Sequence, residues 1–375
     1  RGNTESNAMR ERQEQYPQLE VDLGKLQKNL AALRERCQVS GIKLSGVVKG
    51  FCALPEAAKV YDRAGLDSIG SSRLEQLRTL RQAGIRTPLM MIRIPMLTEV
   101  DELVKWADIS LQSEISVLRA TNEAAARAGV RHKVILMVDL GDLREGFWDR
   151  EELISAAMEV EQKLENLDLL GVGTNLGCYG SVQATPEKME ELISAAEAVE
   201  AAIGRRLEVI SGGASSSVHM VLDGTMPSRI NHLRVGELLL LGRVWGCDMP
   251  ELHKDVFTLR AEVIEVKTKP SHPVGELSVD AFGRTRTYVD RGHRRRALLA
   301  MGRVDYGECE DLVSREPGLI MLGASSDHTL VDVQNTVRDI QVGDILEFDL
   351  CYATMVYLTH SESVHLVFRE ETTSE

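Results

Sequence analysis

Short β-rich runs alternate with helical stretches from about residue 20 to residue 245, and few folds accommodate this alternation. The runs predict strands at residues 43–49, 66–70, 88–93, 107–111, 133–139, 168–174, 206–211 and 231–235. Strands that alternate with helices form parallel βα units, and eight such units favour closure into a barrel. The sequence therefore predicts an α/β fold with a (β/α)8 TIM-type barrel. A doubly wound open sheet is the alternative, and the lack of a GxGxxG motif after the first strand disfavours it.

The stretches between these runs carry helical signals. An apolar stripe at three- and four-residue spacing precedes the first strand, at Leu23, Leu26, Leu30, Leu33 and Cys37. The segments 151–166 and 187–203 are also predicted helices. Thr185 and Pro186 open the second of them as an N-cap followed by a first-turn proline.

The pattern changes after residue 250. Further β-rich runs are separated by Gly, Pro and Asp clusters, without a long helical pattern, at Thr258–Lys267, Ala297–Gly302, Gly318–Leu322 and Ile345–Leu350. We predict a barrel domain over residues 9–248, including an N-terminal strand and helix, and a C-terminal antiparallel β domain over 249–375. Residues 1–8 resemble a cloning scar. The basic cluster 291–296 is interpreted as a strand entry or subunit contact, with an anion site as the alternative.

Charge and cysteine usage restrict the class of protein. A formal net charge of −13 argues against nucleic acid or an anionic membrane as the main partner, and the apolar runs are too short to span a bilayer. The polar start lacks the apolar segment of a secretory signal. Six scattered cysteines without a CxxC pair favour reduced cytoplasmic thiols. The nine histidines show no HExxH spacing, so no metal is expected.

Lys49 is the first candidate for chemistry. In the run KLSGVVKG (43–50) it ends the first predicted strand, directly before Gly50, at the carboxyl end where barrel enzymes keep their active sites. In a partly dry pocket its amine could be deprotonated and form a Schiff base with a carbonyl such as that of pyridoxal phosphate. The alternative is a solvated surface lysine.

The loops after the seventh and eighth strands support the first of these interpretations. The seventh strand runs into ISGGASSS (210–217), whose amides and hydroxyls could cradle a phosphate, and the eighth leads to Gly236 and Glu237. Barrels most often bind phosphate in these two loops. A plain turn followed by a helix cap at Ser215 is the alternative, and the combination with Lys49 favours a phosphorylated cofactor.

The chain resembles the alanine racemase family of fold type III pyridoxal-phosphate enzymes, and within it most closely the ornithine racemase-like branch. The resemblance rests on VVKGFCALPE (47–56), RIPM (93–96), ILMVDLGDLREG (135–146), GVGTNLGCYG (171–180), ISGGASSS (210–217), NHLRVGE (231–237) and LGASSDHTLVDV (322–333). It implies a barrel followed by a β domain, and a homodimer whose active sites use both subunits.

The resemblance also implies roles for residues of the cofactor site. Lys49 matches the lysine that holds pyridoxal phosphate, and Ser215 with the Gly236 and Glu237 amides matches the phosphate site. Arg234 matches an arginine against the pyridine nitrogen. Because an arginine keeps its proton, the ring nitrogen would stay unprotonated, which favours racemisation over transamination.

Other matched positions concern the substrate and the departures from the family. Arg144 matches an arginine near the cofactor's phenolic oxygen and the substrate carboxylate, and Asp327 matches an aspartate that reaches the partner's active site. Asn175 replaces a histidine that stacks on the cofactor ring. Met137 replaces a lysine that can be carbamylated, so no carbamate is expected.

The acid/base group opposite Lys49 is the largest departure. Arg303 stands where the family has its catalytic tyrosine, and Tyr306 lies three residues later. Racemisation by two bases needs acid/base groups on both faces of the α-carbon. We predict Tyr306 as the second base, with Asp305 and His328 as alternatives.

Together these features predict a pyridoxal-phosphate-dependent amino-acid racemase whose small substrate is a basic amino acid such as ornithine or lysine. A decarboxylase of the same fold type and a non-catalytic pyridoxal-phosphate carrier are the alternatives. The β domain argues against the carrier.

Overall fold

The computed structural model describes residues 14–370, so the proposed cloning scar at 1–8 lies outside the described residues. The chain forms two compact units, and each is treated by itself. The barrel unit comprises Leu23–Lys254. The β unit comprises the described residues up to Asp22 together with those from Asp255 onward.

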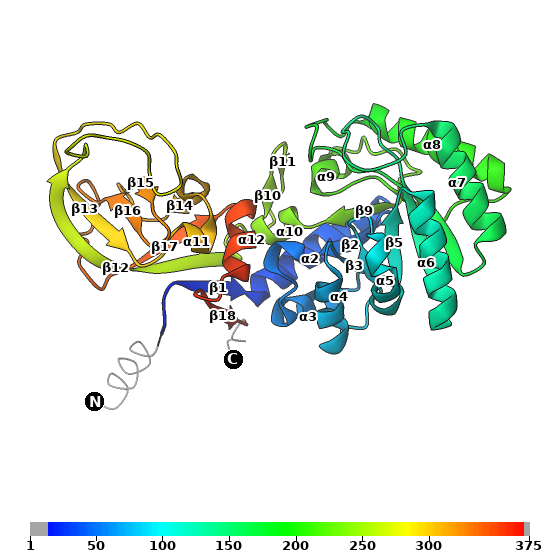
Figure 1. Ribbon diagram of the computed structural model, residues 1–375, viewed down its shortest axis with the longest axis horizontal. Coiled ribbons are helices and arrows are strands. Elements are labelled where there is room, and N and C mark those ends of the chain that lie inside the picture. The colour runs from blue at the N-terminus through cyan, green and yellow to red at the C-terminus, as the bar shows by residue number, and fades with distance from the viewer. Residues whose placement is uncertain (1–13, 371–375) are drawn as a thin grey trace. The chain divides into compact units, whose positions relative to one another are not determined.

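The barrel unit contains the predicted eight-stranded barrel. Its strands pair in parallel and close on one another through β2 and β9 (Figure 1). They are β2 (Lys43–Val47), β3 (Ser68–Ser71), β4 (Leu89–Met91), β5 (Ile109–Gln112), β6 (His132–Met137), β7 (Leu167–Gly173), β8 (Val209–Ser211) and β9 (His232–Val235). Closure confirms the barrel and excludes the open sheet.

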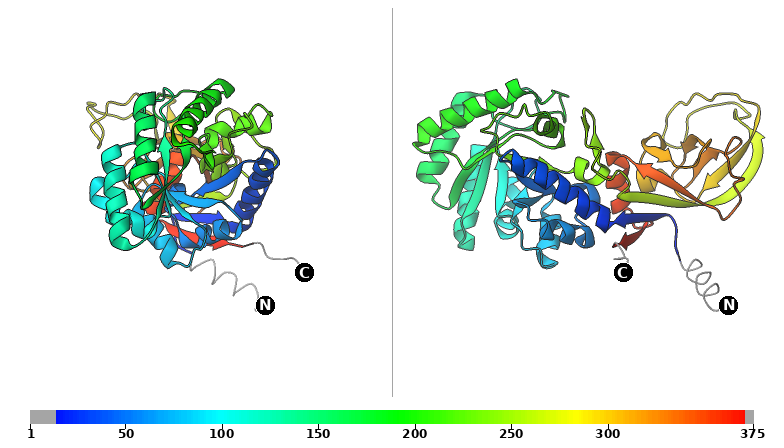
Figure 2. Two further views of the ribbon diagram at one scale, coloured as in Figure 1. Left: turned by 90° about the vertical axis from the view of Figure 1, so that its right-hand side faces the viewer. Right: turned by 180° about the vertical axis from the view of Figure 1, so that it is seen from behind.

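Helices surround the strands of the barrel, as the end-on view in Figure 2 shows. The α-helices are α2 (Leu23–Val39), α3 (Pro55–Arg63), α4 (Leu74–Gln82), α5 (Val100–Trp106), α6 (Ile115–Ala128), α7 (Arg150–Lys163), α8 (Pro186–Ile203), α9 (Val218–Leu222) and α10 (Glu237–Leu241). Short 3-10 turns lie at η1 (Lys49–Phe51), η2 (Leu97–Glu99) and η3 (Ser215–Ser217), and β10 (Arg243–Val244) pairs with β11 (Cys247–Asp248).

Local signals explain where two of these helices lie. In α2, Leu26, Leu30 and Leu33 are fully buried along the predicted apolar stripe. The α8 N-cap is Thr185, whose hydroxyl accepts a hydrogen bond from the Lys188 N–H. The helix ends at Gly204, which adopts φ +75°, a conformation that glycine reaches without strain.

The interior of the barrel has an apolar half and a polar half. Alternate residues of a strand face opposite sides, and one side of β4–β6 forms a buried cluster of Met90, Ile109, Leu111, Ile135 and Met137. The strands β2, β3, β8 and β9 instead bury hydrogen-bonded polar side chains, namely Ser45, Ser68, Ser211, His232 and Arg234. This polar half leads up to the ends of the strands that carry the predicted site.

The β unit is built on an eight-stranded sheet with path β14-β17-β12-β13-β16-β15, to which β1 and β18 attach through β12. All its pairings are antiparallel except that of β1 with β18. Its strands are β1 (Gln18–Asp22), β12 (Phe257–Pro270), β13 (His293–Leu299), β14 (Leu312–Ser314), β15 (Ile320–Ala324), β16 (Thr329–Asp332), β17 (Ile345–Leu350) and β18 (His365–Arg369). The predicted C-terminal antiparallel β domain is thus confirmed.

Helical turns interrupt this sheet at α11 (Arg303–Tyr306), η4 (Cys309–Asp311) and α12 (Tyr352–His360). The sequence after residue 250 predicts no helix such as α12. Its β-branched and aromatic composition favours strands, and its start depends on the Thr354 hydroxyl, which accepts from the Cys351 N–H.

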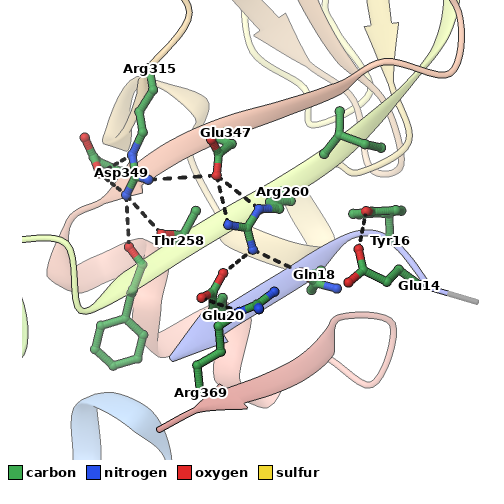
Figure 3. Close-up of polar contacts among 12 residues, drawn as sticks. Glu14, Tyr16, Gln18, Glu20, Thr258, Arg260, Arg315, Glu347, Asp349 and Arg369 are labelled. Atoms are coloured by element: carbon green, nitrogen blue, oxygen red, sulfur yellow. Dashed lines mark hydrogen bonds and ion pairs between the residues drawn. The ribbon is translucent and has the colours of Figure 1, made fainter. Parts of the chain in front are cut away.

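Strand β1 differs from the expected division, which placed it with the barrel. Its main chain pairs with both β12 and β18. Side chains reinforce the pairing, because Arg260 of β12 contacts Gln18, Glu20 and Glu347 (Figure 3). Glu20 also pairs with Arg369 of β18 at 2.6 Å. These partners lie far away in the sequence, so local patterns do not reveal them.

The basic cluster at 291–296 enters strand β13. Arg294 pairs with Asp332 at 2.9 Å, and Arg295 forms an ion pair with Asp339. The Arg296 guanidinium donates to the Pro270 carbonyl at 3.2 Å. These partners favour the strand entry over the anion site. In the same described range, residues 14–370, no helix is both long and apolar enough to cross a bilayer.

Candidate active site

Lys49 lies just beyond the carboxyl end of β2, in the turn η1. The chain leaves this turn through Cys52 and Ala53, whose φ values of 56° and 50° are uncommon for residues other than glycine. The pKa of the Lys49 amine is lowered, chiefly by burial and then by the positive charge of Arg144. A lysine with a lowered pKa supplies more neutral amine, which is the nucleophilic form.

The ends of β8 and β9 meet beside this turn. Gly213 has φ +119°, and a Cβ there would lie 2.6 Å from the Ser217 hydroxyl, so the turn requires glycine. The Ser215 hydroxyl accepts a hydrogen bond from the Leu238 N–H at 3.3 Å. The start of α10 and the serine-rich turn are therefore adjacent, and the first N–H groups of a helix lack intrahelical acceptors. Burial raises the pKa of Glu237, the first residue of α10.

Two hydrogen bonds inside the barrel hold the side chain of Arg234 on β9. Its side chain is almost fully buried, and its guanidinium donates to the Ser211 hydroxyl and, at 2.8 Å, to the Thr174 carbonyl. Burial lowers the pKa of this guanidinium, although arginine remains cationic at neutral pH. Further N–H groups of the same side chain are left for a ligand.

Arg144 lies in the loop after β6, which is closed at its base. The Phe147 N–H donates to the Met137 carbonyl at 2.8 Å, and the Asp139 N–H donates to the Phe147 carbonyl at 3.0 Å. The Arg144 guanidinium forms a two-pronged ion pair with Glu145, at 2.5 and 2.9 Å. This ion pair, above all, raises the pKa of Arg144.

The loop after β7 carries Asn175, whose side-chain amide donates to the Cys178 sulfur at 3.2 Å. Asp142 holds this loop, because its buried carboxylate accepts from the N–H groups of Gly177, Cys178, Tyr179 and Val182. Burial alone would raise the pKa of Asp142, but these hydrogen bonds outweigh it and the pKa is lowered.

These elements place their charges close to one another. Arg144, Glu145 and Cys178 each act electrostatically on both Lys49 and Arg234. The structure therefore gathers predicted residues from β2, β6, β7, β8 and β9 at one end of the barrel, namely Lys49, Arg144, Asn175, Ser215, Arg234, Gly236 and Glu237. Met137 is buried in the apolar half of the interior.

The β unit carries the remaining predicted residues, and two of them are engaged in its core. Tyr306 is 0% exposed, and its hydroxyl lies 2.5 Å from the Thr329 hydroxyl. The Asp305 carboxylate accepts from the Gly302 N–H and the Ser361 hydroxyl. Burial raises the pKa of Tyr306. This burial argues against the prediction of Tyr306, or of Asp305, as the second base.

The turn after β15 is different, because Asp327 and His328 are exposed. Asp327 accepts from the Ser326 hydroxyl at 2.9 Å. The turn packs against Gly302, where a Cβ would lie 2.2 Å from the Ser326 carbonyl oxygen. Arg303 is turned inward, with its guanidinium over the Phe282 ring and paired with Glu308. Of the three candidates for the second base, His328 alone has an accessible side chain.

Sequence reasoning missed several residues of the barrel site. Glu145 follows the predicted Arg144 directly, yet its pairing depends on the fold of the loop. Asp142 and Cys178 lie inside the motifs GDLREG and GVGTNLGCYG and were passed over. Ser211 precedes the predicted Gly212, and His232 lies two residues before Arg234, but their link to Arg234 depends on contacts between β8 and β9.

The residues present fit a phosphorylated aldehyde cofactor. Lys49 offers an amine with a lowered pKa. Gly213 leaves room that a Cβ would fill, and Ser215 with the start of α10 offers a hydroxyl and N–H donors. Arg234 offers a buried, oriented donor. Charge and donor chemistry thus suit pyridoxal phosphate.

Comparisons with known proteins agree with this geometry. The sequence profile of the alanine racemase N-terminal domain matches residues 21–243. The chain is 40% identical to the ornithine racemase of Acetoanaerobium sticklandii, covering 91% of this chain and 96% of that protein. It is 35% identical to the lysine racemase of Thermotoga maritima, covering 94% and 98%. An alanine racemase structure from Clostridium difficile has the same fold, with a TM-score of 0.71, 19% identity and coverage of 96% and 97%.

Proposed function

This chain belongs to the alanine racemase family, and on that premise we propose that it racemises a basic amino acid such as ornithine or lysine. The observation that carries the proposal is the gathering of Lys49, Arg144 and Arg234 at one end of the barrel. The identity of 35 to 40% to two racemases of basic amino acids, over more than nine-tenths of the chain, supports the substrate class.

Lys49 would hold pyridoxal phosphate covalently, and Ser215 with the amides of Gly236 and Glu237 would bind its phosphate. When bound, this cofactor withdraws electrons from a linked amino acid and makes the Cα proton more acidic. Arg234 would donate to the pyridine nitrogen and, as a permanent cation, leave that nitrogen unprotonated. Asn175 would lie beside the ring, and Arg144 would bind the substrate carboxylate.

Proton movement needs one group on each face of the α-carbon. Lys49 would serve one face, because burial lowers its pKa and so raises the share of neutral amine that can take a proton. We assign the other face to His328, supplied by a partner subunit of a homodimer, since Tyr306 and Asp305 are occupied within the β unit. Asp327 beside it would approach the substrate. None of the six cysteines, all within residues 14–370, forms a disulfide, which supports a cytoplasmic location.

The first test is solvent-deuterium exchange at Cα, followed by NMR with purified, cofactor-loaded protein and a panel of L-amino acids. Exchange with inversion on ornithine or lysine is the expected result. Loss of the carboxylate as carbon dioxide would instead identify a decarboxylase. Binding of cofactor without exchange or decarboxylation of any amino acid would identify a carrier.

A further inference from the structure

Arg234 is the end of a chain of buried hydrogen bonds that runs through the polar half of the barrel interior. Its guanidinium donates to the Ser211 hydroxyl. That hydroxyl lies 2.7 Å from Nδ1 of His232, and Nε2 of His232 lies 2.6 Å from the Ser45 hydroxyl. Ser45 in turn contacts Ser68. The described contacts thus connect strands β9, β8, β2 and β3 through side chains alone.

The partners of Ser211 set the direction of these hydrogen bonds. A guanidinium is only a donor, so the Ser211 oxygen accepts from Arg234, and among the described contacts of Ser211 the acceptor for its own proton is Nδ1 of His232. Nδ1 is then an acceptor without a hydrogen. A neutral imidazole carries its hydrogen on the other nitrogen, so Nε2–H donates to the Ser45 hydroxyl.

The charges around His232 keep the ring neutral. Asp67 would favour the charged form, but its carboxylate oxygen lies 3.8 Å from Nε2, beyond hydrogen-bond distance. The side chain is almost fully buried, and Arg234 and Lys43 are both cationic. Burial, followed by these two charges, lowers the pKa of His232 to about 3.

We propose that His232 is a positioning residue of the cofactor site: as the neutral Nε2–H tautomer it accepts the Ser211 proton and so keeps the Ser211 oxygen available to Arg234. The Arg234 guanidinium is then held by Ser211 and the Thr174 carbonyl, with its other N–H groups free for the cofactor's ring nitrogen. This inference rests on the proposed function, because it assigns Arg234 to that nitrogen.

A second buried histidine provides a matched control. His132 on β6 is also 1% exposed, and its Nε2 lies 2.8 Å from the Ser110 hydroxyl. Ile135 and Met137 face the barrel interior, so His132 lies on the opposite face of β6, between the strands and the helices. Its partner Ser110 does not contact Arg234. Both histidines therefore have similar burial and bonding, and only one is linked to the cofactor site.

The direct test is 15N NMR of histidine-labelled protein, with and without cofactor, in which His232 is assigned by comparison with His232→Gln. We expect an Nε2–H tautomer with an unprotonated Nδ1 that shows no protonation down to about pH 4.5, more than a unit above its lowered pKa. A hydrogen on Nδ1, or protonation near pH 6, would overturn the proposal.

The functional test compares His232→Leu with His132→Leu in two readouts. One is the pH dependence of the bound cofactor's absorbance without substrate, and the other is the amount of pyridoxamine phosphate formed per racemisation turnover. With Arg234 released, the ring nitrogen should protonate at higher pH, and the side reaction should rise roughly tenfold, as losses of supporting hydrogen bonds do at metal sites. His132→Leu should leave both readouts unchanged.

Equal behaviour of the two leucine variants would show that His232 only fills the core. If His232→Leu does not fold, His232→Gln keeps the test open, because its amide can accept from Ser211 and donate to Ser45, and we expect near wild-type readouts. Readouts in His232→Gln as altered as those after loss of Arg234 would contradict the proposal. Failure of the wild-type protein to exchange any Cα proton would instead reject the proposed function, while the tautomer result stands.

Discussion

The barrel unit and the β unit both bury polar side chains, but they use them differently. At the end of the barrel, Lys49 lies in a buried turn with a lowered pKa, and Arg234 keeps N–H groups for a ligand. In the β unit, the polar atoms of Tyr306 and Asp305 form hydrogen bonds with neighbouring groups of the same unit. Residue type alone therefore does not identify a catalytic group. A catalytic group is identified by the hydrogen-bonding capacity that its neighbours leave available.

The largest expected effect is that of Lys49→Ala, which removes the proposed covalent attachment and one acid/base group. We expect loss of the lysine-bound cofactor absorbance and of all racemisation. Lys43→Ala is the matched control, because Lys43 lies at the opposite end of β2 with a side chain that is 76% exposed. A Lys49→Ala protein that retains the lysine-type absorbance would refute the assignment.

The next effect concerns the β unit, where the comparison singles out His328. Replacement of an acid/base group slows reactions by roughly 10²- to 10⁴-fold, so His328→Gln should lower racemisation by at least about a hundredfold. The cofactor absorbance should not change. His272→Gln serves as a control in the same unit, since its Nδ1 lies beside the Pro273 carbonyl. Wild-type turnover in His328→Gln would show that His328 is not the second base.

The sequence predicted the barrel well because the relevant signals are local. Each βα unit carries its own apolar strand and helical stripe, and Thr185 and Gly204 mark the ends of a helix directly. Lys49 and the glycine-rich turn at Gly213 could be predicted for the same reason, because each lies at the carboxyl end of a predicted strand, where barrels place their chemistry.

The features that escaped prediction depend on contacts between distant segments. Strand β1 joins the β unit through partners more than two hundred residues away, including Arg260. Burial of Tyr306, in α11, depends on its packing against Thr329 on strand β16. The role of His232 depends on Ser45, Ser211 and Arg234, which lie on three strands. Spacing in a single sequence carries no signal for such three-dimensional neighbours.

A smaller effect is expected from acid. Burial lowers the pKa of His132 to about 4 and that of His232 to about 3, whereas an unfolded histidine titrates near 6.5. Between these values the unfolded chain binds protons that the folded barrel does not. The free energy of unfolding should therefore fall with decreasing pH, by about 1.4 kcal/mol per histidine for each pH unit below about 6.5.

Chemical denaturation between about pH 4.5 and 7 measures this slope. In His132→Gln the contribution of His132 should disappear, so that the variant loses less stability on acidification than the wild-type protein. An unchanged slope would mean that the histidine is protonated inside the folded barrel. Comparison with His232→Gln then shows whether the two histidines, one in the outer layer and one in the interior, contribute equally.

The smallest effect, and the one that most sharpens the contrast between the units, is that of Tyr306→Phe. The Thr329 hydroxyl donates its proton to the Met301 carbonyl at 2.8 Å, so the Tyr306 hydroxyl must be the donor in the bond between them. Burial, above all, raises the pKa of Tyr306, so its hydroxyl keeps the proton that it donates. Tyr306→Phe should cost about 1 kcal/mol of stability, the usual value of a buried hydrogen bond, and leave racemisation nearly unchanged.

Thr329→Val tests the same bond, and a double-mutant cycle should show coupling between the two changes. A hundredfold loss of turnover in Tyr306→Phe, with stability intact, would instead restore this tyrosine as the second base.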